Sequence, residues 1–151
     1  MRKAAVMLWR SRAELLGAMA VVLMASAAPG QGQDFTTAAE VKPILTMTKA
    51  SWIALRPEGG NDLLYFTNAL AWRCGVSEIR YGVNGAAPET VLEMEPCYEG
   101  EATPNALKMD KGIMPYVVLP LESVASVAVV VVFDDGSEEP ATYQRKAVLI
   151  P

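Results

Sequence analysis

The chain has 151 residues, with 13 Lys and Arg against 17 Asp and Glu, a net charge of -4 and no histidine. Without histidine, Cys-His and Ser-His catalytic pairs and histidine-ligated zinc sites are excluded. The negative charge disfavours nucleic acid and anionic lipid as partners, since both repel an acidic surface.

The first 27 residues have the layout of a secretory signal peptide. Arg2 and Lys3 precede an apolar run over 15–24, and Ala25-Ser26-Ala27 gives the Ala-x-Ala pattern of a cleavage site. The run is shorter than the roughly 20 apolar residues of a membrane span. We expect general secretion with cleavage after Ala27, and an uncleaved anchor is the alternative. The leader holds four basic residues and one acidic residue, so its removal leaves 9 basic and 16 acidic residues, a net charge of -7.

The remainder of the chain fits one domain, because domains cluster near 100 to 150 residues. Its start, APGQGQDFTT, is polar and has little to bury. We therefore expect a disordered linker over 28–39 and a domain over 40–151, in a periplasmic or secreted protein.

Short alternating apolar segments, separated by turn residues about every ten positions, predict an all-β domain. The expected fold is a single antiparallel β-sandwich of about seven strands. The predicted strand segments are 41–48, 51–56, 63–74, 77–83, 90–94, 116–119, 124–133 and 141–150. In 63–74 the spacing of Leu63, Phe66 and Leu70 also fits a helix, but Thr67-Asn68 favours a strand.

Two turn sequences predict antiparallel neighbours. Asn84-Gly85 and Asp134-Asp135-Gly136 contain the residues that most easily take positive φ in tight hairpins. The segment 129–133 is apolar at every position, as in a strand buried on both faces. The acidic residues that follow it act against edge-to-edge pairing.

Between residues 95 and 112 the sequence is polar and has no sustained period, which predicts a long loop. The loop contains Cys97, and Cys74 lies at the end of a predicted strand. An exported chain meets an oxidising compartment, so we expect a Cys74–Cys97 disulfide worth about 3 kcal/mol. The separation is too long for a C-x-x-C redox or zinc motif, and a free reactive thiol is the alternative.

We predict no catalytic residue, no metal site and no cofactor, since neither Ser-x-x-Lys nor a phosphate-binding loop occurs. The candidates for contact with a partner lie in or beside the long loop: Glu95, Tyr98, Glu99, Glu101, Asn105 and Tyr116. Acidic side chains of this set could instead serve a hydrolase or lyase, or bind calcium. Solvated acidic surface is the simplest interpretation.

The segments SWIALR, LLYF, WRCG, EIRYGVNG and TPNA, followed by VVVVFDDGS, resemble small exported bacterial proteins with no assigned activity. The VVVVFDDGS hairpin is also similar to immunoglobulin-like and fibronectin-type modules. This resemblance implies a β-sandwich and no catalytic residues. The sequence departs from true immunoglobulin domains, because its cysteines are closer together and Trp72 precedes both of them.

The sequence therefore favours a non-enzymatic binding or assembly module of the bacterial envelope. It would engage a protein partner through an edge strand or the 95–112 loop. A small carboxylate-based hydrolase or lyase, and a lipid- or polysaccharide-binding domain, are the alternatives.

Overall fold

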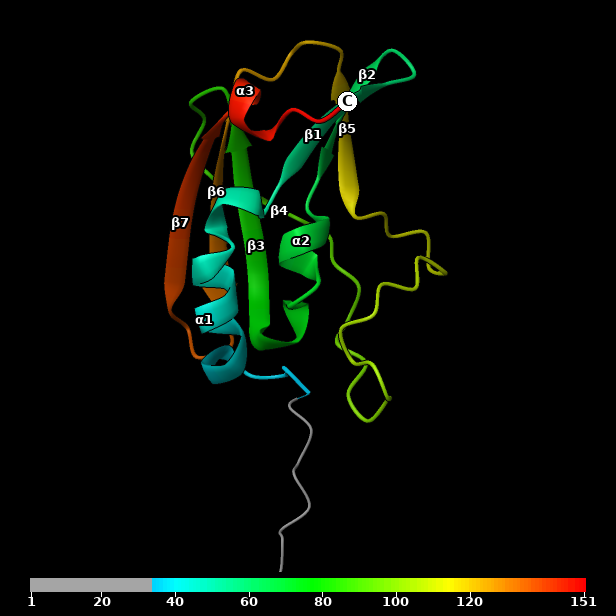
Figure 1. Ribbon diagram of the computed structural model, residues 1–151, viewed down its shortest axis with the longest axis vertical. Coiled ribbons are helices and arrows are strands. Elements are labelled where there is room, and N and C mark those ends of the chain that lie inside the picture. Colours follow the sequence, from blue (N-terminus) through cyan, green and yellow to red (C-terminus); the bar gives the residue numbers. More distant parts are fainter. Residues whose placement is uncertain (1–33) are drawn as a thin grey trace, which may run out of the picture. The chain divides into compact units, whose positions relative to one another are not determined.

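A computed structural model describes residues 34–151 (Figure 1). The expected signal peptide and the linker up to residue 33 lie outside the described residues. Residues that precede position 40 already pack against the domain, since the Phe35 ring lies edge-on against Trp72 with the ring centroids 5.2 Å apart. Among the described residues, no helix has the length and apolar character needed to cross a membrane.

Within residues 34–151, seven strands form two antiparallel sheets, which confirms the all-β prediction at this level. The three-stranded sheet has the order β1-β2-β5, with β1 at Ala54–Glu58, β2 at Asn61–Tyr65 and β5 at Tyr116–Pro120. The four-stranded sheet has the order β4-β3-β6-β7. Its strands are β3 at Val76–Val83, β4 at Thr90–Val91, β6 at Ser126–Phe133 and β7 at Glu138–Gln144.

The prediction of a strand over 41–48 is wrong, because this segment belongs to helix α1 (Ala38–Met47). The Glu40 carboxylate accepts the backbone N–H of Thr37 at 3.1 Å and so closes a capping box. Ala38, Val41 and Leu45 then fall on one buried face at helical spacing. Figure 1 shows α1 in front of the four-stranded sheet.

The predicted strand over 63–74 is correct only as far as Tyr65. The chain then forms the short helix α2 (Thr67–Leu70) and the 3-10 turn η2 (Arg73–Gly75). Phe66, Ala69 and Leu70 are buried at helical spacing, so the helical alternative holds from Phe66 onward.

The remaining predicted strands match with shifted ends. The segments 77–83, 116–119 and 124–133 correspond to β3, β5 and β6, while 90–94 shortens to β4. The 3-10 turn η1 (Lys49–Ser51) replaces the start of 51–56, and 141–150 is divided between β7 and the helix α3 (Arg145–Val148).

Both predicted turns are present, and both join antiparallel strands. Asn84, Gly85 and Gly136 have φ values of 54°, 85° and 80°, the left-handed region that these residues tolerate. A Cβ atom on Gly82 would lie 2.4 Å from the carbonyl oxygens of Ala86 and Ala87. A glycine at this position therefore lets the returning chain fold against β3.

Both sheets and α1 contribute to one hydrophobic core. Its largest fully buried side chains are Trp52, Phe66, Phe133, Leu45, Leu55, Leu64 and Ile79. The Trp52 indole N–H donates to the Leu45 carbonyl at 2.8 Å, which satisfies the buried polar atom of this side chain. The segment 129–133, predicted to be buried on both faces, is buried except at Val132, which is partly exposed.

A buried ion pair links the two sheets. The Asp62 side chain on β2 is fully buried, and Arg145, which follows β7, contacts both of its carboxylate oxygens at 2.5 and 2.9 Å. Arg145 also donates to the Val124 carbonyl at 3.0 Å. The hydrogen bond from Arg145 holds the pKa of Asp62 below its usual value, although burial opposes this shift.

Replacing Asp62 with Asn should lower the free energy of unfolding at pH 7 by about 3 kcal/mol, because the partly buried Arg145 guanidinium loses its counter-charge. The pKa of Asp62 is depressed in the folded state, so its contribution is complete above the unfolded value, near pH 4, and declines at lower pH. The difference in the free energy of unfolding between Asp62→Asn and wild type, measured by urea denaturation, should therefore be smaller at pH 3 than at pH 7. Asp110→Asn, in an exposed part of the long loop, is the matched control and should have little effect at either pH.

Candidate functional site

Arg73 organises the long loop after β4. Its side chain is 2% exposed, and its guanidinium donates only to backbone carbonyls. The shortest contacts are 2.9 Å to Glu95, 3.0 Å to Pro96, 2.5 Å to Asn105 and 3.0 Å to Ala106. Burial lowers the pKa of Arg73, with the charge of Glu95 acting in the opposite direction. The residue that stands beside Cys74 in the sequence therefore holds two separate parts of the loop together.

Glu95 holds the loop in place through its side-chain carboxylate. Its side chain is 3% exposed, and its carboxylate accepts the Tyr98 hydroxyl at 2.8 Å. The backbone N–H groups of Lys108 and Met109 donate to the same carboxylate at 2.9 and 2.6 Å. Burial raises the pKa of Glu95, but these hydrogen bonds outweigh it and hold the pKa below its usual value. Glu95 therefore remains a buried carboxylate ion.

The disulfide and Asn105 also attach the long loop to the rest of the domain. Cys74 and Cys97 are bonded, as predicted, with a Cα–Cα distance of 4.8 Å. The Asn105 side chain accepts the Cys74 N–H at 2.9 Å and donates to the Phe35 carbonyl at 2.9 Å. The loop is thus tied to η2 and to the segment that precedes α1.

The predicted partner-contact residues have different surroundings in the structure. Glu95 and Asn105 have their polar groups occupied within the protein, while Glu99 and Glu101 are exposed. Glu101 pairs with Lys108 at 2.8 Å. Tyr116 lies apart from these residues on β5, with its ring 4.9 Å from that of Tyr65.

Tyr98 has cations close to its ring. The Lys108 ammonium lies 3.9 Å from the ring centroid, and the Arg73 guanidinium lies 5.4 Å from it. The hydrogen bond to Glu95 raises the pKa of the Tyr98 hydroxyl to about 12. This tyrosine is therefore part of the loop scaffold.

Sequence reasoning did not identify which strand edges are open. Edge β4 has only two residues. The Phe133 N–H donates to the Ser137 carbonyl, so these two residues form a hydrogen-bonded pair of the β6–β7 ladder. Because such pairs alternate, Pro140 lies at an outward-facing position of β7, and proline has no N–H to offer there. On β1 the outward carbonyl of Leu55 accepts the Ile150 N–H at 2.9 Å, and the next outward residue is Pro57. These three edges are short or protected.

The edge of β5 is different. Phe66 N–H donates to the Pro115 carbonyl at 2.8 Å, so Pro115 belongs to a hydrogen-bonded pair of the β2–β5 ladder. Because such pairs alternate, Val117 and Leu119 bond to β2, while the N–H and C=O groups of Tyr116 and Val118 point away from it. Within 34–151, no other backbone group bonds to these outward groups.

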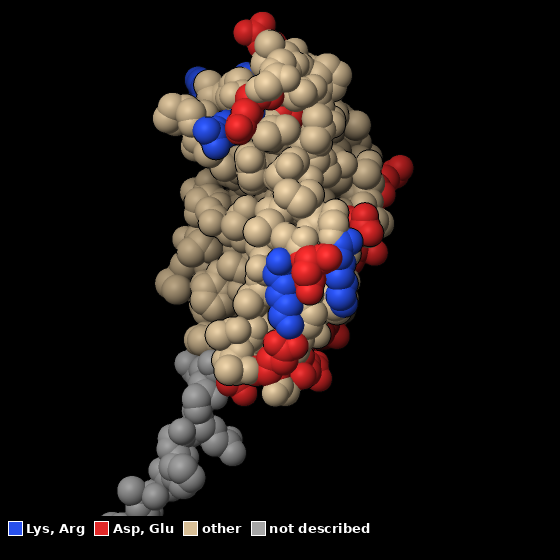
Figure 2. All heavy atoms as spheres, turned by 90° about the vertical axis from the view of Figure 1, so that its right-hand side faces the viewer, with Lys and Arg blue, Asp and Glu red and all other residues tan. Residues whose placement is uncertain are grey.

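The surface around this edge is largely apolar, and Glu93, which lines a hollow beside Tyr116 and Val117, is a charged residue next to it. Val118 is 59% exposed, and Met114 and Leu121 beside it are 40% and 48% exposed. Figure 2 views the side on which β5 lies, where charged side chains gather near the top and in the lower half and the area between these groups is uncharged. An exposed edge with this composition is a template for strand addition.

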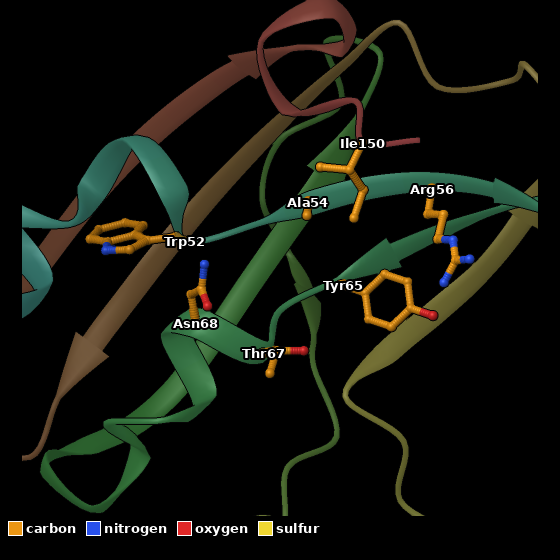
Figure 3. A pocket seen from close by; sticks show the side chains of 7 residues that line it. All are labelled: Trp52, Ala54, Arg56, Tyr65, Thr67, Asn68 and Ile150. Atoms are coloured by element: carbon orange, nitrogen blue, oxygen red, sulfur yellow. The ribbon is translucent and has the colours of Figure 1, made fainter.

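A hollow of about 440 Å³ opens next to the outer face of the same sheet. Figure 3 shows its lining: Trp52, Ala54, Arg56, Tyr65, Thr67, Asn68 and Ile150. Trp52, at one end of this lining, is fully buried, and Asn68 donates to the Ser51 carbonyl. Among the described residues, no three acidic or cysteine side chains gather to form a metal site.

In comparisons with protein-family models, with curated proteins and with solved structures, none matches this chain.

Replacing Arg73 with Lys should lower the free energy of unfolding by about 3 kcal/mol, because an ammonium cannot reach all the carbonyls that the guanidinium satisfies. Amide hydrogen exchange should rise across 95–112 more than in β6. Arg56→Lys, at a side chain 46% exposed, is the control and should change neither quantity measurably. Equal effects of the two substitutions would contradict the role assigned to Arg73.

Removing the disulfide by the double substitution Cys74→Ser and Cys97→Ser should cost about 3 kcal/mol of stability, since the bond closes a loop of 23 positions. Urea denaturation of wild type and variant measures this loss. Because Arg73 and Glu95 still hold the loop, circular dichroism of the folded variant should match that of wild type. A variant with altered strand content would show that the bond determines the fold as well as its stability.

Proposed function

We propose that this chain is an exported, non-enzymatic binding module of the bacterial envelope that accepts a strand of a protein partner at the edge of β5. The observation that carries the proposal is the outward-pointing N–H and C=O groups of Tyr116 and Val118, on a strand without charged residues and within a largely apolar surface. Main-chain hydrogen bonds to such an edge give affinity, and neighbouring side chains give specificity.

The proposed location is the periplasm or the exterior of the cell. The signal-like leader supports export. The Cys74–Cys97 bond supports it independently, since disulfides persist in oxidising compartments. An envelope protein is accordingly the class of partner that we propose.

We also propose that the two sheets form an immunoglobulin-like sandwich. If the strands are lettered A to G in chain order, the observed sheets read A-B-E and D-C-F-G. The constant-type immunoglobulin arrangement is A-B-E-D and C-F-G. The two differ only in the fourth strand, which here pairs with the third strand and not with the fifth. The disulfide does not join the two sheets, which is the main departure from that fold.

A carboxylate-based hydrolase is less well supported. Glu95 is the most deeply buried acid of the loop, but its oxygens accept hydrogen bonds from the loop itself. Its lowered pKa keeps it ionised at neutral pH, whereas a general acid needs a raised pKa. Glu95 therefore serves the structure of the loop.

Site-specific photo-cross-linking in cells tests the proposal. A photoreactive residue at position 118, on the outer edge of β5, should give a discrete covalent adduct. The same residue at Thr142, exposed on the edge that contains Pro140, should give none. Mass spectrometry identifies the captured protein. Absence of any adduct at position 118, in a chain shown to be exported and folded, would overturn the proposed function.

A further inference from the structure

We infer that the strand added to β5 belongs to a second copy of this chain, in antiparallel orientation, with Tyr116 opposite Val118 of the other copy. The inference rests on the proposed function, since it uses the same open edge. It joins the two three-stranded sheets into one continuous sheet across a two-fold axis.

The hydrogen-bonding groups of β5 match themselves in this register. Tyr116 and Val118 each present one outward N–H and one outward C=O. When Tyr116 of one copy faces Val118 of the other, both residues form a hydrogen-bonded pair and every outward group is satisfied. A register centred on Val118 would instead pair Tyr116 with Pro120, which has no N–H and whose carbonyl already accepts the Ser123 N–H at 3.0 Å.

The charges at the two ends of the strand favour the antiparallel orientation. From Tyr116 to Pro120 the strand has no charged residue, so two copies meet there without repulsion. Asp110 and Lys111 precede the strand and offset each other, and Glu122 follows it. Antiparallel pairing keeps the two copies of Glu122 at opposite ends of the shared edge, whereas parallel pairing would bring them side by side.

The side chains agree with the same arrangement. Tyr116 and Val118 share the outer face of the sheet, so the exposed Val118 of one copy lies beside the Tyr116 ring of the other. On the inner face, Val117 lies directly opposite Val117 of the second copy, across the two-fold axis. Pairing thus covers the most exposed apolar side chain of β5 with a matching apolar surface.

Cysteine cross-linking tests the register. Val117 forms a non-hydrogen-bonded pair with itself, where the Cα atoms lie about 4.5 Å apart, a separation that a disulfide spans. Val117→Cys should therefore give a covalent dimer of the full exported chain on mild oxidation. Val118→Cys is the matched control, because its two copies are diagonal neighbours about 7 to 8 Å apart and should cross-link poorly. The reverse pattern would overturn the proposed register.

Sedimentation velocity over a concentration series tests the association itself. Wild type should form dimers, and Val118→Pro should weaken dimerisation by about 30-fold, since one N–H donor is lost from each copy. Val118→Thr keeps the N–H and should dimerise nearly as wild type does. Circular dichroism verifies that the variants are folded.

A wild-type chain that remains monomeric at the highest soluble concentration, with no Val117→Cys dimer, would overturn this inference. If photo-cross-linking at position 118 then captured a different protein, the proposed strand-addition function would stand and only its partner would change. If it captured nothing, both proposals would fail.

Discussion

The buried guanidinium of Arg73 is the interaction on which the arrangement of the long loop depends. A loop that lies against a hydrophobic core buries backbone carbonyls, and each carbonyl without a donor costs free energy. Arg73 supplies several donors in one rigid plane and reaches carbonyls on both arms of the loop. The adjacent Cys74 bonds to Cys97, so covalent and polar attachment coincide. A thiol beside an arginine, which could suggest an activated nucleophile, is here a point of attachment.

The acidic residues have separate physical roles. Asp62 and Glu95 are buried, and each has its charge compensated, by Arg145 across the two sheets in one case and by loop N–H groups in the other. The exposed Glu138 lies on β7, where charge discourages pairing with another chain, while the partly buried Glu139 pairs with Lys49. The buried acidic residues thus hold parts of the protein together, and the exposed acid on β7 protects a sheet edge.

The edge of β5 is the candidate for strand addition because the edges of β1, β4 and β7 are short or protected. Pro57 and Pro140 remove N–H donors from β1 and β7, and β4 ends after two residues. Each of these features lowers the tendency of an edge to pair. Strand β5 has neither a charge nor an internal proline, and its outward groups lie in an apolar surface. This difference locates the proposed binding surface outside the pinned loop and on the opposite sheet from the disulfide-linked η2–β3 region.

The sequence by itself determined the features that depend on local pattern. Alternating or continuous apolar segments predicted β3, β5 and β6, positive-φ residues marked the turns at Asn84 and Gly136, and two cysteines in a chain expected to be exported predicted their bond. Helix α1 was also encoded locally by Thr37 and Glu40, although its apolar residues suggested a strand. Only the tertiary structure decided that Glu95 is buried and that β5 has an open edge. Burial and strand order arise from contacts between distant residues, such as Asp62 with Arg145, and no local pattern specifies them.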